Sequence, residues 1–127
     1  MMTDKTFLLV DDATFIRTML KDVIEEIENY HVIGEAKNGR EAIEQAALLQ
    51  PDVMTIDITM PEVDGIEAIP EIVKKSPNTK IIVVSAMGNR EQVLKALKCG
   101  ASEFVVKPFD KTRVIAAIYK VLSEDSI

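Results

Sequence analysis

Phe7-Leu8-Leu9-Val10-Asp11-Asp12 is the stretch that decides the fold, because four apolar residues are followed at once by two carboxylates. From Thr14 onward the apolar residues change to helical spacing and recur every three or four positions. A short apolar run without polar alternation is typical of a strand that is covered on both faces of a parallel sheet. The stretch therefore predicts the first β-α unit of an α/β protein, with two carboxylates at the carboxyl end of its strand.

The same unit recurs along the chain. The predicted strands, each bounded by turn signals, are Phe7–Val10, Val32–Ala36, Val53–Asp57, Lys80–Ser85 and Glu103–Val106. The predicted helices begin at Thr14, follow Asn38-Gly39, and cover about Gly65–Lys75, Arg90–Lys98 and Lys111–Ser123. Right-handed crossovers leave few topologies for such a series. We expect a flavodoxin-like α/β fold, a doubly wound five-stranded parallel sheet of order 2-1-3-4-5 with five helices.

Two helices carry more local expectations. In the first helix the residues predicted to be buried form one row at four-residue spacing and a second row that broadens it: Phe15, Met19, Val23 and Ile27, then Ile16, Leu20 and Ile24. Arg17 is predicted to face water, and Thr14 is the expected N-cap. Pro70 lies inside the third helix, where it removes an amide donor and clashes with the preceding turn, so we expect a kink or a late start.

Length and composition limit the class of protein. A chain of 127 residues predicts a single domain over residues 1–127, with no output domain. The formal net charge is −6, and no run of Lys or Arg is present, which argues against binding to nucleic acid or an anionic membrane. Cys99 is the only cysteine, which excludes an internal disulfide and a cysteine metal cage. The N-terminus lacks the apolar run of a signal peptide, and we expect a cytoplasmic protein.

Three carboxylates are expected to meet at one edge of the sheet. Asp11 and Asp12 follow the first strand, and Asp57 ends the third. In the 2-1-3-4-5 order, the carboxyl ends of these two strands flank the point where ligands bind. Like charges so close together repel one another unless a cation compensates them. Mg²⁺ suits this set because it takes one or two carboxylates, keeps several waters and accepts a phosphate oxygen, whereas the nitrogen and sulfur ligands of zinc are missing.

Lys107 and Ser85 are expected at the same edge. Lys107 follows the fifth strand and Ser85 closes the fourth, so a cation and a hydroxyl donor emerge beside the carboxylates. Together they make an anion site next to a metal. A carboxylate that attacks phosphorus gives an aspartyl phosphate, and a metal and a lysine stabilise the charge on the transferred group. Asp57 is the natural nucleophile in this arrangement.

Four motifs resemble the receiver domain of two-component response regulators, in particular the stand-alone receivers of bacterial chemotaxis. The matching stretches are Leu8-Leu9-Val10-Asp11-Asp12, Asp57-Ile58-Thr59-Met60-Pro61-Glu62-Val63-Asp64-Gly65, Ser85-Ala86 and Val106-Lys107-Pro108-Phe109. The resemblance covers nearly the whole chain.

The resemblance implies a role for each residue of the acidic group. Asp57 accepts the phosphoryl group from a histidine kinase and contributes to the Mg²⁺ site. Asp12 ligates the metal directly, Asp11 helps through a water, and the carbonyl of Thr59 completes the protein ligands. Thr59 and Met87 occupy positions that flank the path of the hydrolytic water.

The resemblance also implies how the switch works. Ser85 and Lys107 bind the phosphoryl oxygens, and Ser85 moves toward the phosphoryl group as the aromatic residue on the last strand, Phe104, turns inward. The peptide bond before Pro108 is implied to be cis. The fourth helix, fifth strand and fifth helix form the implied partner face, which binds a flagellar switch protein or a phosphatase. The implied state is a monomer.

Three other functions fit parts of the sequence. A flavin mononucleotide carrier needs a phosphate-cradling loop after the first strand, where Asp11-Asp12 would repel the phosphate, and aromatic residues that this chain lacks. A small phosphohydrolase with an aspartate nucleophile requires a second acid two residues later to protonate the leaving group, and Thr59 occupies that position. A third hypothesis is a phosphorelay intermediate, which passes its phosphoryl group to a histidine phosphotransfer domain. The sequence does not separate it from a chemotaxis regulator.

Overall fold

The computed structural model describes residues 3–60 and 63–123. Its strands are β1 (Lys5–Val10), β2 (Tyr30–Ala36), β3 (Val53–Ile56), β4 (Lys80–Ser85) and β5 (Glu103–Val106). Its helices are α1 (Thr14–Glu25), α2 (Gly39–Leu49), α3 (Gly65–Lys75), α4 (Arg90–Cys99) and α5 (Lys111–Ser123). The strands form one parallel sheet in the order β2-β1-β3-β4-β5, which confirms the predicted topology.

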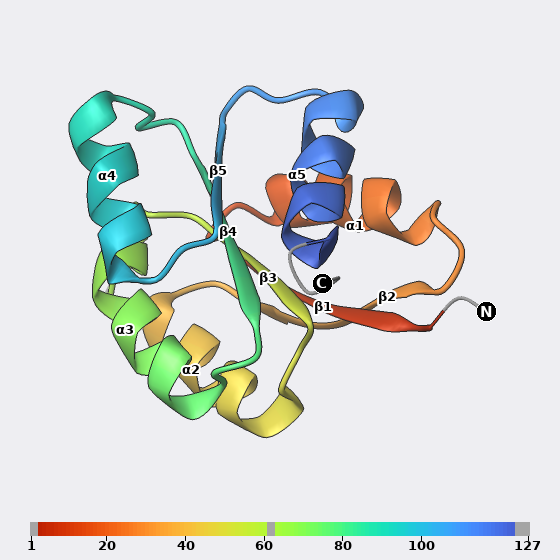
Figure 1. Cartoon of the computed structure of the whole chain (residues 1–127), viewed down its shortest axis with the longest axis horizontal. Coiled ribbons are helices and arrows are strands. Elements are labelled where there is room, and N and C mark those ends of the chain that lie inside the picture. The colour runs from red at the N-terminus through yellow and green to blue at the C-terminus, as the bar shows by residue number, and fades with distance from the viewer. Residues whose placement is uncertain (1–2, 61–62, 124–127) are drawn as a thin grey trace.

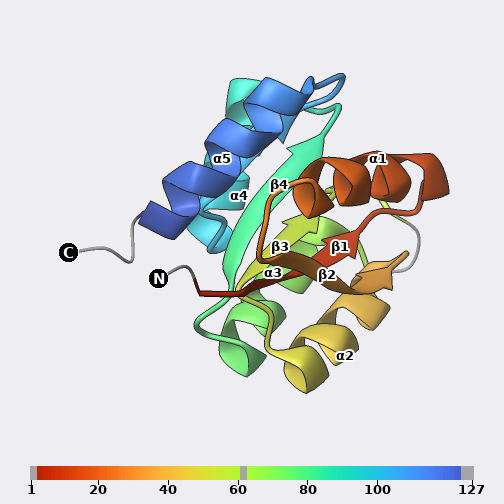
Figure 2. The same cartoon turned by 90° about the vertical axis from the view of Figure 1, so that its right-hand side faces the viewer.

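Helices cover both faces of the sheet. Helices α1 and α5 lie on one face, and α2, α3 and α4 lie on the other (Figures 1 and 2). Successive residues of a strand point to opposite faces, so Leu8 and Val10 of β1 join the core under α2 to α4, and Phe7 and Leu9 join the core under α1 and α5. Both cores consist mainly of apolar side chains, which explains why the central strands show little polar alternation.

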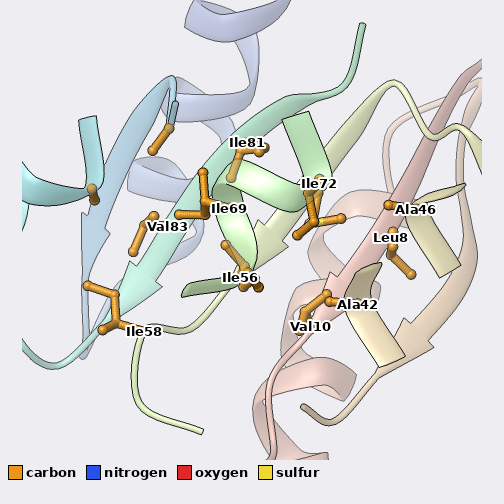
Figure 3. Packing of buried hydrophobic residues seen from close by; sticks show 14 of the residues in the cluster. Leu8, Val10, Ala42, Ala46, Ile56, Ile58, Ile69, Ile72, Ile81 and Val83 are labelled. Atoms are coloured by element: carbon orange, nitrogen blue, oxygen red, sulfur yellow. The ribbon is translucent and has the colours of Figure 1, made fainter. Parts of the chain in front are cut away.

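The core beneath α2 to α4 brings those helices close to the sheet. Figure 3 shows Ala42 and Ala46 of α2 beside Leu8 and Val10. The two alanines are completely buried, and their small side chains let the helix backbone approach the strand. Ile69 and Ile72 of α3 occupy the same layer over β3 and β4, and they are also completely buried.

Helix α1 packs on the sheet through a different row of apolar residues from the one expected at the centre of its buried stripe. Phe15 is 66% exposed and Met19 is 38% exposed, whereas Ile16, Leu20 and Ile24 are buried. The two rows are adjacent on the helix, so periodicity alone could not decide which of them faces the sheet. The N-cap prediction was also wrong, because α1 begins at Thr14 and its N-cap is Ala13, which has no side-chain cap.

Helix α3 contains Pro70 but starts where the sequence placed it. Asp64 accepts a hydrogen bond from the Glu67 N–H, and the Glu67 carboxylate accepts one from the Asp64 N–H. This capping box fixes the first turn at Gly65, so the expected late start was wrong. The helix then runs through Pro70 to Lys75, and the alternative expectation of a kink stays a prediction.

Candidate functional site

The three predicted aspartates lie together at the carboxyl ends of β1 and β3. One carboxylate oxygen of each lies within 4.8 Å of the others. The Asp11 N–H donates to the carbonyl of Ala36 at 3.0 Å, and the Asp57 N–H donates to the carbonyl of Val10 at 3.1 Å. These bonds extend the pairing of the sheet by one residue, so the sheet itself positions both acids. Asp11 and Asp57 are buried, and Asp12 is exposed.

Lys107 joins this cluster from the loop after β5. Its ammonium lies 2.8 Å from Asp11 Oδ2 and 3.1 Å from Asp57 Oδ2, and 17% of its side chain is exposed. Burial lowers the pKa of Lys107, but its hydrogen bonds to the two carboxylates, together with their charges, outweigh burial and raise that pKa above the ordinary value. Lys107 is therefore a cation in the site at neutral pH. The Lys107–Pro108 peptide bond is cis, as the resemblance implies.

Thr59 contacts the cluster, and Ser85 lies at the carboxyl end of β4, the strand next to β3. The Thr59 N–H donates to Asp57 Oδ1 at 3.3 Å, so each carboxylate oxygen of Asp57 accepts a hydrogen bond from a described residue. The Thr59 hydroxyl turns instead to the sulfur of Met87, at 3.3 Å. Ser85 is 1% exposed, and its Oγ accepts a hydrogen bond from the Met87 N–H at 3.1 Å. That contact leaves the hydroxyl hydrogen of Ser85 available for another acceptor.

Asp64 and Gly65 fix the loop that follows Asp57. The Gly65 N–H donates to the carbonyl of Ile58 at 2.9 Å, and a side chain at position 65 would clash with the backbone of Asp57 and Ile58. Only glycine allows helix α3 to start this close to the end of β3. Within the same motif, Pro61-Glu62 lies outside the described residues.

The donor set fits a hard divalent cation. Three carboxylates face one ammonium, so two negative charges remain uncompensated. The Asp12 carboxylate makes no hydrogen bond or ion pair with any residue that the structure describes. All nearby ligands are oxygens, and His31 lies elsewhere, 3.6 Å from Asp4. Mg²⁺ prefers such oxygen ligands and retains waters in the remaining positions.

Arg17 belongs to the site although the sequence placed it on the water-facing side of α1. Its Nη1 donates to the Asp11 carbonyl at 2.5 Å, and its Nε donates to Glu35 Oε1 at 2.8 Å. Its side chain is 15% exposed. A cation in the first turn of a helix opposes the positive end of the helix dipole, and that signal could have indicated a specific partner for Arg17.

Phe104, the expected switch residue, is 6% exposed and lies in the core beneath α4. Its backbone lies at the outer edge of the sheet. The Phe104 N–H donates to Glu103 Oε1 at 3.0 Å, and its carbonyl accepts from Arg113 Nη2 at 2.9 Å. Side chains therefore form hydrogen bonds with the Phe104 backbone groups, which have no neighbouring strand on that side of β5. The aromatic ring is in the inward position, and its movement stays a prediction.

Comparisons with known proteins decide the family. The sequence model of the family described as response regulator receiver domain matches residues 7–119. The chain belongs to the response regulator receiver family. This receiver is 56% identical to the chemotaxis protein CheY of Thermotoga maritima over 117 residues, which are 92% of this chain and 97% of the relative. It is 46% identical to the chemotaxis protein CheY of Bacillus subtilis, over 91% of this chain and 96% of that one.

A solved structure agrees with these relatives. The receiver superposes with a TM-score of 0.89 and 32% identity on a chain of the CheX–CheY–BeF₃–Mg²⁺ complex from Borrelia burgdorferi, covering 94% of this chain and 90% of that one. The sequence-based recognition of a CheY-like receiver is thus confirmed. Within the part of the receiver that the structure describes, none of the helices has the length and apolar character needed to span a bilayer.

Proposed function

We propose that this receiver is the phosphorylated response regulator of a chemotaxis system, and that Asp57 accepts the phosphoryl group from a histidine kinase. The observation that carries the proposal is the setting of the Asp57 carboxylate. It is buried, it faces the ammonium of Lys107 at 3.1 Å, and two further carboxylates lie within 4.8 Å. Three carboxylates beside one ammonium leave negative charge uncompensated, which supports a site that binds a cation.

The acidic group supplies the proposed metal site. Asp11, Asp12 and Asp57, with the carbonyl of Thr59, are the residues that would hold Mg²⁺. Bound there, the ion neutralises negative charge on the transferred phosphoryl oxygens. The Asp12 carboxylate supports this assignment, because its oxygens have no hydrogen bond or ion pair within the described part of the chain and are available to a ligand.

The proposed transfer is an in-line displacement at phosphorus. An oxygen of Asp57 attacks the phosphorus of the kinase phosphohistidine, and the O–P bond forms as the P–N bond breaks. The electron pair of that bond returns to the imidazole nitrogen, which takes up a proton. Lys107 and the Ser85 hydroxyl would then neutralise the phosphoryl oxygens; Lys107 already contacts Asp57, and Ser85 ends β4, the neighbour of β3 in the sheet. Attack by water on the aspartyl phosphate later returns the carboxylate and inorganic phosphate.

The proposed output surface is the face formed by α4, β5 and α5. Apolar and basic side chains share this face, with apolar Leu94, Leu97, Val106 and Tyr119 exposed beside Lys95, Lys98 and Lys120. Phe104 lies directly beneath it, so a movement of Ser85 and Phe104 would alter it. A flagellar switch protein or a phosphatase is the proposed partner. A CheY occurs in complex with CheX in the Borrelia burgdorferi structure, which supports a protein partner for this receiver.

The remaining parts of the proposal concern the state of the protein. We take it to be a monomeric, cytoplasmic, single-domain receiver of residues 1–127 that acts as a switch and not as an enzyme. The single-domain part of this proposal is supported by the CheY relatives, since the matched region spans 97% of the Thermotoga maritima protein and 96% of the Bacillus subtilis protein.

Phosphotransfer and partner binding test the proposal together. A chemotaxis histidine kinase that carries a labelled phosphoryl group should transfer it to the wild type and not to Asp57→Asn. The phosphorylated receiver should then bind a flagellar switch protein at least about tenfold more tightly than the unmodified one, which corresponds to about 1.4 kcal/mol. Labelling of Asp57→Asn, or equal affinity in both states, would contradict it.

The same experiment separates the alternatives. Onward transfer of the label to a histidine phosphotransfer domain, without a change in affinity for the switch protein, would identify a phosphorelay intermediate. Repeated turnover of a small phosphate ester would identify a phosphohydrolase, although Thr59 offers no acid for the leaving group at that position.

A further inference from the structure

Arg17 connects three elements around the first metal-site loop. Its guanidinium donates to the Asp11 carbonyl at 2.5 Å, to Glu35 at 2.8 Å and to the Thr14 hydroxyl at 3.3 Å. Glu35 lies near the end of β2, and Thr14 opens α1. The loop that carries Asp11 and Asp12 is therefore tied to the neighbouring strand and to the helix through one side chain.

The contacts of Asp11 show what this tie fixes. Its N–H donates to Ala36, its Oδ1 accepts from the Ala13 N–H at 2.9 Å, and its Oδ2 accepts from Lys107 at 2.8 Å. The carbonyl that Arg17 holds is the remaining polar group of the residue, and it belongs to the peptide unit that joins Asp11 to Asp12. The orientation of that peptide unit sets the direction in which Asp12 leaves the backbone.

Asp12 has no contact of its own that could set its direction. Its side chain is exposed, and it makes no hydrogen bond or ion pair with the described residues. Its two carboxylate neighbours repel it from the cluster. Only the backbone can hold it near Asp11 and Asp57 before a cation arrives, and the carbonyl on its N-terminal side is held by Arg17.

We propose that Arg17 is a positioning residue for Mg²⁺ binding, which orients the peptide between Asp11 and Asp12 so that the Asp12 carboxylate faces the cluster. This inference rests on the proposed function, because it assumes that the cluster binds Mg²⁺. Glu35 assists by holding the guanidinium from the β2 side. Arg17 itself touches neither the metal site nor the phosphoryl acceptor through its charge, since its bond to Asp11 is to a backbone carbonyl.

Positioning and simple electrostatics make opposite predictions for Arg17→Gln. Loss of a positive charge near three carboxylates should strengthen the binding of a cation. Loss of the bond that orients the Asp11–Asp12 peptide should weaken it. We expect the dissociation constant for Mg²⁺, measured by isothermal titration calorimetry on the full chain, to rise about tenfold, which corresponds to about 1.4 kcal/mol.

Two further variants sharpen the experiment. Lys21→Gln removes the same charge from the exposed side of α1, where the lysine makes no hydrogen bond or ion pair with the described residues, and its Kd should stay within about twofold of the wild type or fall. Arg17→Lys keeps the charge, but a single ammonium lacks the planar fork that reaches two acceptors at once, so its Kd should rise by about threefold. Arg17→Lys also serves if Arg17→Gln does not fold.

Thermal unfolding by circular dichroism separates positioning from stability. A Kd that is unchanged or lower in both Arg17 variants, with only a lower Tm, would overturn the inference. The rate of phosphorylation by acetyl phosphate should return to within about twofold of the wild type at saturating Mg²⁺, and a persistent deficit would also overturn it. Failure of the wild type to bind Mg²⁺ would instead refute the proposed function, so the two failures are distinguishable.

Discussion

Replacement of Lys107 by methionine should destabilise the protein because Lys107 is the one cation that contacts both buried carboxylates within the described chain. Methionine keeps the unbranched apolar stem and removes the ammonium. The Asp11 and Asp57 carboxylates would then remain buried, with side-chain exposures of 2% and 10%, without their ionic partner.

The magnitude follows from the geometry. Carboxylate oxygens within 4.8 Å of one another repel by at least about 3.5 kcal/mol at an effective dielectric constant of 20. Lys107 offsets this repulsion by lying 2.8 and 3.1 Å from the two groups. Removal of one partner of a buried ion pair costs about 3–5 kcal/mol in general. The free energy of unfolding should therefore fall by about 3 kcal/mol at neutral pH without Mg²⁺.

The assay is urea unfolding followed by circular dichroism, since the chain has no tryptophan. Lys111→Met is the matched control, because Lys111 lies 2.8 Å from Glu26 but both side chains are more than half exposed. The exposed pair should contribute less than about 1 kcal/mol. Mg²⁺ should restore more stability to Lys107→Met than to Lys111→Met, because the cation takes over part of the neutralisation. Equal losses in the two variants would refute the reasoning.

Three further perturbations test neighbouring features. Asp12→Asn should raise the free energy of unfolding by about 1 kcal/mol without Mg²⁺ and abolish stabilisation by Mg²⁺ in the same urea assay, since an unpartnered carboxylate is removed. Thr55→Val should raise the free energy of unfolding by about 1 kcal/mol, and with it the Tm, because the buried Thr55 hydroxyl has no hydrogen-bond partner among the described residues. A lower Tm would contradict this. The folded-state pKa of Lys107 lies above 10.5, so its stabilising contribution is complete below about pH 10.5 and is lost as the pH rises through the folded-state pKa. The stability gap between wild type and Lys107→Met should accordingly close at high pH, and a gap that widens would be inconsistent with this cation.

The sheet was predictable because its strands are buried on both faces. The bounds of β4 and β5 agree with the predicted ranges, since apolar runs end there at Ser85 and Val106. Strand β2 starts at Tyr30, two residues earlier than expected, because it is an edge strand with alternating exposure and has no continuous apolar run. The convergence of the aspartates followed from the topology, which places the ends of β1 and β3 side by side.

Side-chain contacts between elements were beyond the sequence. Arg17 occupies a position that helical periodicity assigns to the water-facing side, and its partner Glu35 is 18 residues away on another strand. Phe15 and Ile16 are equally apolar, and only the packing of α1 on the sheet decides that Ile16 is buried. Such choices depend on the rotation of a helix about its axis, which a period of 3.6 residues leaves open when two apolar rows are adjacent.

The most direct test of the central claim is the intact mass of the protein after incubation with acetyl phosphate, with and without Mg²⁺, beside Asp57→Asn. The account expects the wild type to gain one phosphoryl group only when Mg²⁺ is present and the variant to gain none. A wild type that gains no mass with Mg²⁺, or an Asp57→Asn variant that gains as much as the wild type, would contradict the assignment of Asp57 as the phosphoryl acceptor.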